Sequence, residues 1–239
     1  MLLEARGIVK AFGAFRAVDG ADLMLEAGEL LGLIGPNGAG KSTFFNCLSG
    51  DARPTAGTIR LRGADITALP PEAHARLGLA RTFQVPIVFD TMTVRENVMV
   101  GAFLRHSHRR AAAAKADEVL AFTGLAEQAN LRATALGTPG RKRLEIARAL
   151  ATEPEVLLLD EALAGLASSD VEAAIELVRR IHERGVTLIV VEHIMEVIHR
   201  LTQRVLVFHQ GRVIAQGTPA EVTADEAVIT AYLGRRVRK

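Results

Sequence analysis

The chain has 239 residues, of which 49% are hydrophobic, and its formal net charge is +2. This length fits one large domain or two small ones, and the apolar content suffices for a sizeable buried core. The longest apolar runs are far shorter than the roughly 20 residues that a membrane-spanning helix needs, so we expect no membrane span. The N-terminus lacks the pattern of a secretory leader, and the single cysteine, Cys47, fits a reducing compartment. We therefore expect a cytosolic protein.

Basic residues gather in two places, between residues 105 and 110 and at the end of the chain (Arg235, Arg236, Arg238 and Lys239). Such clusters can attract nucleic acid or anionic lipid. The other interpretation is a solvated loop and a charged tail. We favour the second, because no aromatic residues interleave with the charges to stack on bases.

The predicted strands are of two kinds. Residues 2–10 and 58–62 mix polar and apolar side chains, as antiparallel strands with one solvent-exposed face do. Residues 30–34, 156–159 and 187–191 are short, uninterrupted apolar runs, which are typical of buried parallel strands.

Amphipathic helices are predicted between the buried strands. Apolar residues recur at three- and four-residue spacing in residues 111–122, 143–151 and 171–184. Because strands alternate with helices, the central sheet should be parallel. Residues 94–132 hold no convincing strand, and we interpret them as an inserted helical lobe.

A glycine-rich segment directly follows the strand predicted over residues 30–34. It reads G-P-N-G-A-G-K-S-T and satisfies the phosphate-binding pattern G-x-x-x-x-G-K-[ST]. Glycines let the backbone aim successive N–H groups at phosphates beside a helix N-terminus. Lys41 adds a positive charge near the β- and γ-phosphates, and the Ser42 hydroxyl suits Mg²⁺. A plain helix-capping turn is the alternative, but the lysine and its spacing disfavour it. The predicted nucleotide contacts are Gly35, Pro36, Asn37, Gly38, Ala39, Gly40, Lys41, Ser42 and Thr43.

Two adjacent carboxylates, Asp160 and Glu161, follow the strand predicted over residues 156–159. The carboxyl edge of an open α/β sheet is where ligands bind. Asp160 fits an aspartate that holds Mg²⁺ through its water shell, and Glu161 fits the general base that polarises the attacking water. A solvated acidic helix start is the alternative, and the upstream phosphate loop disfavours it.

The order of these motifs resembles that of the ABC transporter ATPases over nearly the whole chain. R-T-F-Q at residues 81–84 resembles the family's Q-loop. This implies that Gln84 senses the metal and the attacking water, and that residues 85–91 contact a membrane subunit. His193 in V-V-E-H resembles the switch histidine that contacts the γ-phosphate. Phe12 resembles the aromatic residue that stacks on adenine, with Phe15 or simple core packing as alternatives.

Finer features resemble importer ATPases of the branched-chain amino acid type: F-G-A-F-R-A-V-D, D-I-T-A-L-P-P-E, T-V-R-E-N-V, R-L-E-I-A-R-A-L and the closing A-Y-L-G. The resemblance implies an α/β fold of the P-loop NTPase (RecA-like) class. A mostly parallel sheet would carry an N-terminal antiparallel β subdomain and an inserted α-helical subdomain. All 239 residues would form one ABC ATPase domain, with residues 1–93 and 150–239 as the catalytic core and 94–149 as the helical lobe.

The resemblance also implies a function and partners. ATP hydrolysis with Mg²⁺ would power import of branched-chain amino acids or related solutes. A second ABC ATPase subunit, transmembrane permeases and, indirectly, a solute-binding protein would be partners, and the chain would lie on the inner face of the plasma membrane. The alternative is a soluble ABC-type ATPase that acts on nucleic acid or ribosomes. It normally needs a tandem domain, a coiled-coil insertion or a basic linker, which we do not find in the sequence. A small-molecule kinase would have no use for the Q-loop and the switch histidine.

Two departures from the family pattern concern the partner's site. Where the family has L-S-G-G-Q, residues 136–140 read L-G-T-P-G, so Gly137 and Gly140 replace the serine and the glutamine. Thr138 is expected to cap the following helix, whose first turn suits Pro139. Ala167 stands where the family's D-loop carries aspartate or asparagine. The alternatives are a weakened composite site in an asymmetric heterodimer and a variant loop that still works, and we prefer the first.

Overall fold

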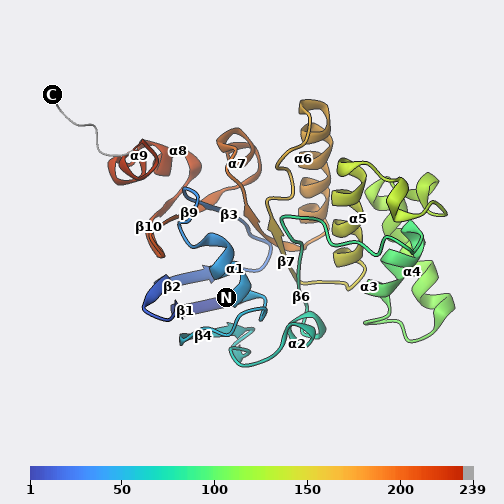
Figure 1. Cartoon of the computed structure of the whole chain (residues 1–239), viewed down its shortest axis with the longest axis horizontal. Coiled ribbons are helices and arrows are strands. Elements are labelled where there is room, and N and C mark those ends of the chain that lie inside the picture. Colours follow the sequence, from blue (N-terminus) through green and yellow to red (C-terminus); the bar gives the residue numbers. More distant parts are fainter. Residues whose placement is uncertain (234–239) are drawn as a thin grey trace. The chain divides into compact units, whose positions relative to one another are not determined.

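The computed structural model describes residues 1–233, which divide into two compact units (Figure 1). Unit 1 combines Met1–His74 with Thr187–Lys239, and unit 2 is Ala75–Val186. The basic tail and the glycine of A-Y-L-G lie outside the described residues.

Unit 1 contains an antiparallel sheet with the strand order β2-β1-β4-β5. The strands predicted over residues 2–10 and 58–62 are confirmed as β1 and β4. The sequence did not suggest β2, which pairs along the whole of β1. In β2, buried Val18, Ala21, Leu23 and Leu25 stand among more exposed residues, so only one face is buried. The four strands are β1 (Leu3–Phe12), β2 (Phe15–Leu25), β4 (Ala56–Leu61) and β5 (Ala64–Asp65).

The other strands of unit 1 follow one another in the order β10-β9-β3-β8. β3 (Leu30–Ile34) lies between β8 (Thr187–Val191) and β9 (Arg204–His209) and is parallel to both. β10 (Arg212–Gly217) returns antiparallel to β9. Every residue of β3 and β8 is buried, which is why their sequences are uninterrupted apolar runs. The helices of this unit are α1 (Lys41–Leu48), α7 (Met195–Leu201), α8 (Pro219–Ala224) and α9 (Glu226–Leu233), and α2 (Pro71–Arg76) contains the point where the chain passes to unit 2.

An apolar cluster in unit 1 joins the end of β3 to the last two helices. Ile34 of β3 belongs to the same cluster as Ile198 of α7, Val222 of α8 and Val228 of α9. Figure 1 shows α8 and α9 side by side next to β10. Burial of these side chains is the main favourable term holding α8 and α9 in place, since helices this short are unstable alone.

Unit 2 contains the parallel strands β6 (Leu79–Arg81) and β7 (Val156–Asp160) and a group of helices. The helices predicted over residues 111–122, 143–151 and 171–184 are confirmed, each with a slightly earlier start. α3 (Val94–Ala102) and α5 (Thr138–Leu150) pack so closely that a Cβ at Gly101 would lie 2.2 Å from the Arg148 carbonyl oxygen. The other helices are α4 (Arg109–Thr123) and α6 (Ser168–Glu183), with 3-10 turns at Ala126–Gln128 and Ala133–Ala135.

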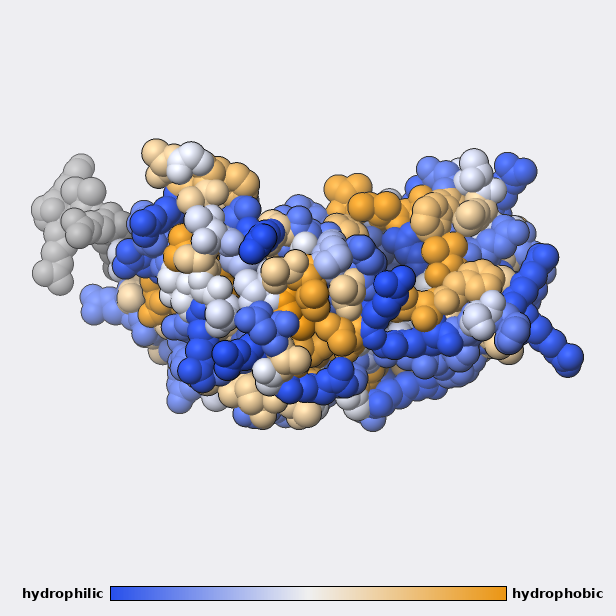
Figure 2. All heavy atoms as spheres, turned by 90° about the horizontal axis from the view of Figure 1, so that it is seen from below, coloured by the Kyte–Doolittle hydropathy of each residue, from blue (hydrophilic) through white to orange (hydrophobic). Residues whose placement is uncertain are grey.

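The face drawn in Figure 2 shows hydrophobic patches separated by hydrophilic side chains. Within residues 1–233, no helix has both the length and the hydrophobicity that crossing a membrane would require.

Candidate nucleotide site

The glycine-rich segment forms the connection between β3 and α1 in unit 1. Gly35 has φ +151° and Gly40, the N-cap of α1, has φ +103°. A Cβ at Gly35 would lie 2.2 Å from the Phe208 carbonyl oxygen, and a Cβ at Gly40 would lie 2.3 Å from that of Ala17. These two positions therefore require glycine both for their backbone angles and for the close approach of neighbouring strands.

Lys41 lies at this loop, as its motif predicts. Its side chain is almost fully buried, and Nζ donates hydrogen bonds to the Gly35 carbonyl oxygen at 2.7 Å and the Pro36 carbonyl oxygen at 3.1 Å. The ammonium group is therefore held by the backbone of the loop that precedes α1. A phosphate at this loop would meet a fixed positive charge and the N-terminal N–H groups of a helix.

The turn between β9 and β10 supports the loop from the side. The N–H of Gly211 donates to the Ala39 carbonyl oxygen, and the Gly211 carbonyl oxygen accepts from Asp19 of β2, both at 2.8 Å. Hydrogen bonds from Arg16 and Arg212 lower the pKa of the Asp19 carboxyl. Three strands thus meet at the phosphate loop through backbone and side-chain bonds.

Helix α9 contributes a contact that the sequence did not suggest. The Tyr232 hydroxyl of A-Y-L-G lies near the backbone of Gly35, the first residue of the loop. Partial burial raises the pKa of this hydroxyl, and the neighbouring Gly35 backbone partly offsets the effect. The last described helix therefore lies beside the start of the phosphate loop.

The predicted residues of unit 1 that lie outside the phosphate loop and α1 are exposed. His193 follows β8 and its side chain is open to solvent. Phe12 is 58% exposed and Phe15 is 66% exposed, on either side of the β1–β2 turn. These exposed fractions remove core packing as an alternative for both rings, and either ring is available to stack on a base.

Unit 2 brings together the predicted acidic and amide side chains. Asp160 ends β7 and is buried, and Glu161 follows it with φ +47°. Nε2 of Gln84 donates a hydrogen bond to Oε2 of Glu161 at 2.7 Å. The three residues to which we assign metal and water chemistry in this unit are thus adjacent along one edge.

Arg81 is a partner of this group that motif reading did not single out, although it lies within R-T-F-Q. Its Nη2 donates to Oδ2 of Asp160 at 3.2 Å, in an ion pair whose two side chains are 9% and 6% exposed. The Asp160 backbone N–H donates to the hydroxyl of Thr82 at 3.2 Å. Both contacts fix the carboxylate at the end of β7.

The altered signature segment differs in detail from our expectation. Gly137, not Thr138, is the N-cap of α5, without a side-chain capping bond, and Thr138 is already helical. Gly137 has an extended backbone (φ −68°, ψ 173°) and Thr138 is the first helical residue, so Pro139 is the second residue of the first turn, where a missing N–H is still tolerated. Ala167 is likewise an N-cap without a side-chain bond, at the start of α6.

The backbone of residues 85–91 is held from within unit 2, while three of its apolar side chains face solvent. The N–H of Ile87 donates to Oε1 of Glu145 at 3.2 Å, and the N–H of Phe89 donates to Oδ1 of Asn97 at 2.8 Å. Burial raises the pKa of the Glu145 carboxyl, against the opposing effect of the backbone groups of Ile87 and Phe83. Val85 is 75% exposed, and Ile87 and Phe89 are also exposed.

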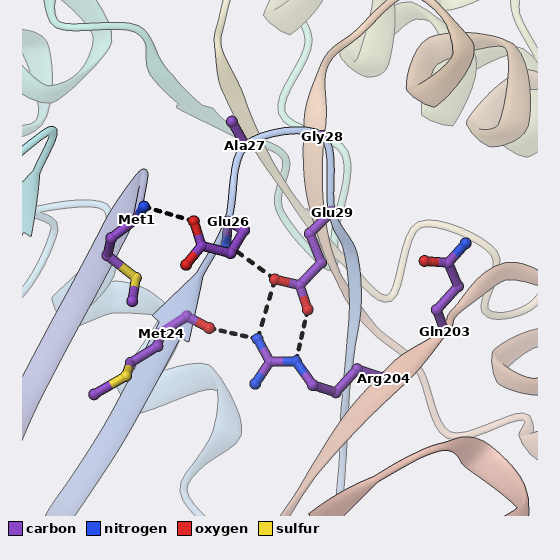
Figure 3. Close-up of a pocket in the computed structure, with 8 residues that line it drawn as sticks. All are labelled: Met1, Met24, Glu26, Ala27, Gly28, Glu29, Gln203 and Arg204. Atoms are coloured by element: carbon purple, nitrogen blue, oxygen red, sulfur yellow. Dashed lines mark hydrogen bonds and ion pairs between the residues drawn. The ribbon is translucent and has the colours of Figure 1, made fainter.

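A hollow of about 500 Å³ lies at the other end of the parallel strands of unit 1 (Figure 3). There Arg204, the first residue of β9, pairs with both carboxylate oxygens of Glu29, at 2.6 and 3.1 Å. The N-terminal amine of Met1 pairs with Glu26 at 2.5 Å. Ligands of α/β sheets bind at the carboxyl ends of strands, so this hollow is not the nucleotide site.

Comparison with known proteins identifies the family. The family model described as "ABC transporter" matches residues 18–164, more than half of the chain. This chain belongs to the ABC transporter ATP-binding family. A second model, described as "Branched-chain amino acid ATP-binding cassette transporter", matches residues 212–238.

Similar ABC transporter ATP-binding proteins match almost end to end. The chain is 39% identical to the high-affinity branched-chain amino acid transport ATP-binding protein LivG of Escherichia coli K12, with 98% of each chain covered. It is 38% identical to the corresponding protein BraF of Pseudomonas aeruginosa, again over 98% of each. These relatives do not favour the nucleic-acid alternative.

Solved ABC cassettes confirm the predicted fold class. A nucleotide-free ATP-binding cassette of an ABC transporter matches with a TM-score of 0.89 and 29% identity, covering 98% of this chain and 99% of that one. The ADP conformation of the cassette MJ1267 matches with a TM-score of 0.88 and 30% identity, covering 98% of each. This ABC protein is thus a P-loop ATPase of α/β class that binds and hydrolyses ATP.

Proposed function

We propose that this ABC ATPase powers the import of branched-chain amino acids or closely related small solutes. The observation that carries the proposal is the end-to-end similarity to LivG and BraF, together with the branched-chain match at residues 212–238. The chain would act on the inner face of the plasma membrane with permease subunits, a second ABC ATPase and, indirectly, a solute-binding protein.

In the proposed phosphoryl transfer, residues of unit 1 bind the nucleotide and residues of unit 2 activate the attacking water. The loop of unit 1 binds the triphosphate through its N–H groups and Lys41, and His193 contacts the γ-phosphate. From unit 2, Glu161 accepts the proton of the attacking water and Gln84 orients that water. Such a reaction depends on positioning and electrostatic stabilisation, with no covalent intermediate.

Oxygen donors suited to Mg²⁺ are present in both units. The Ser42 side chain is exposed at the start of α1, and the Asp160 carboxylate ends β7. Mg²⁺ prefers oxygen ligands and keeps several waters, so one hydroxyl, one carboxylate and substrate phosphates fit its needs. When bound, the ion would neutralise charge on the phosphates. Ser42 would be a direct ligand, while Asp160 and Gln84 would act near its water shell.

The exposed apolar side chains of residues 85–91 support a permease contact. Val85, Ile87 and Phe89 would be costly to leave in water, and their backbone is already held by Glu145 and Asn97. A Val85→Asp/Ile87→Asp double variant should keep the ATPase rate of the isolated subunit and lose copurification with the permeases. Leu131→Asp, at another exposed apolar position of unit 2, is the matched control. Unchanged copurification of the double variant would contradict this surface assignment.

The first test of the catalytic proposal is whether ATP binding requires Lys41. Lys41→Ala should abolish tight binding of a fluorescent ATP analogue, because the phosphates lose their fixed positive charge. Lys115→Ala removes a lysine that instead bonds Glu118 and Glu153, and should leave binding intact. Transport itself is tested by reconstituting the complex with radiolabelled leucine. Leucine uptake that does not depend on ATP or on Lys41 would refute the importer proposal.

A further inference from the structure

Lys142 is a buried cation to which none of the sequence motifs assigns a role. It lies on α5 and is 8% exposed, so its ammonium group cannot rely on water for hydrogen bonds. Nζ donates to the carbonyl oxygen of Glu161 at 2.9 Å and to that of Ala164 at 2.7 Å. Charge-assisted bonds of this length are among the stronger hydrogen bonds in proteins. Lys142 therefore ties α5 to the turn that follows β7.

The turn that Lys142 holds has an unfavourable backbone conformation. Glu161 has φ +47°, in the left-handed region that residues other than glycine seldom adopt. Such conformations persist only where surrounding contacts determine them. The Glu161 carbonyl oxygen accepts one bond from Lys142 and another from the N–H of Ala164, at 3.1 Å. Two donors thus meet at the carbonyl of the strained residue.

We propose that Lys142 is a positioning residue for hydrolysis: its ammonium group fixes the backbone of Glu161, and thereby the direction of the carboxylate that meets Gln84. The inference rests on the proposed role of Glu161 as general base. It also links the helix that follows the altered signature segment to the catalytic turn of the same chain. In this proposal Lys142 acts on Glu161 of its own chain. It does not act as a surface charge that attracts the nucleotide of a second subunit.

The kinetic test separates positioning from binding. In Lys142→Met, we expect an ATP affinity within about twofold of the wild type and a fall in kcat of about 10- to 100-fold, since a misplacement of 1 Å can cost about 10²-fold. Lys142→Arg keeps the charge and the donors and should recover most of kcat. Lys115→Met is the control, because Lys115 of unit 2 bonds Glu118 and Glu153 instead of the turn.

Amide hydrogen exchange gives a readout that does not depend on catalysis. In the isolated, nucleotide-free subunit, Lys142→Met should accelerate exchange in peptides covering residues 161–167, including the N–H of Ala164, and Lys115→Met should not. Wild-type exchange and kcat in Lys142→Met would overturn the proposal. Equal losses of ATP affinity, melting temperature and kcat without rescue by arginine would also overturn it, because they indicate a general structural role.

The failure of the proposed function would look different. If Glu161→Gln hydrolyses ATP at the normal rate, the general-base assignment fails whatever Lys142 does. Faster exchange of the turn in Lys142→Met would then still establish the backbone contact, and only its catalytic consequence would be lost.

Discussion

The amide of Gln84 and the carboxylate of Glu161 form a hydrogen bond of 2.7 Å, joining residues 77 positions apart in the sequence. The carboxylate must accept a proton from water during hydrolysis, so this amide lies where it can orient the base. Because Nε2 can only donate, the bond requires an acceptor on Glu161. Replacing either residue of the pair therefore tests the catalytic assignment.

Replacing the base tests the assignment directly. Glu161→Gln should bind ATP as the wild type does and hydrolyse it about 10²–10⁴ times more slowly, as is typical for loss of a general base. Steady-state phosphate release and nucleotide titration measure the two quantities. Glu127→Gln, at an exposed position of the same unit, should leave both unchanged. A Glu161→Gln turnover close to wild type would exclude Glu161 as the base.

Changing the amide to a carboxylate should lower turnover more than removing the amide does. In Gln84→Glu, two carboxylates would face each other at hydrogen-bond distance, and because like charges repel, the Glu161 carboxylate should leave its place. Gln84→Leu removes the hydrogen bond without adding a charge and should lower kcat less. Steady-state phosphate release measures both rates. A higher kcat in Gln84→Glu than in Gln84→Leu would contradict the pairing during turnover.

Two glycines of the phosphate loop should differ in their tolerance of a methyl group. At Gly40, alanine would meet the Ala17 carbonyl oxygen, whereas at Gly38 a Cβ has no atom within 4 Å. Both have positive φ, so Gly38→Ala should cost about 1–2 kcal/mol in free energy of unfolding. Gly40→Ala should cost more, because the clash adds to this strain. Urea denaturation measures the difference, and equal losses would contradict the packing of β2 on the loop.

Restoring the signature serine should help in two ways. A serine at the N-cap Gly137 could accept a bond from the N–H of Gly140, since Pro139 has none, and its Cβ would meet only the ring of Pro139, at 3.9 Å. We expect a gain of a few tenths of a kcal/mol in stability and a higher ATPase rate in the assembled complex. Gly137→Ala is the control without a hydroxyl. If the rate stays unchanged, the variant loop already works.

The only cysteine should be unreactive in the folded protein. Burial raises the pKa of the Cys47 thiol from 9.0 to about 11, so at pH 8 the thiolate fraction is on the order of one in a thousand. Modification by a disulfide reagent at pH 8 should be slow without urea and fast with it. The raised pKa also means that Cys47 contributes stability below about pH 9, which is lost as the pH rises through 11. Rapid modification of the native chain would contradict its burial.

Local chemistry explains how much could be predicted from the sequence. The phosphate loop, the carboxylates after residues 156–159 and the buried strands are each defined by neighbouring residues, and the structure places them in the expected elements. β2, β9 and the pair α8–α9 depend on partners elsewhere in the chain: charged side chains mask the alternation in β2, and α8 and α9 are too short to show a helical period. Arg81 contacts a residue 79 positions away and Lys142 one 19 positions away. No motif pattern includes such pairs.

The cluster that contains Ile34 and Val228 has an evolutionary consequence. The region matched by the branched-chain model, residues 212–238, includes helices whose side chains border the strand entering the phosphate loop. Substitutions in α8 or α9 would change the packing behind that loop without altering any nucleotide contact. Changes in these two helices therefore offer a way to shift the phosphate loop while the groups that carry out the chemistry stay the same.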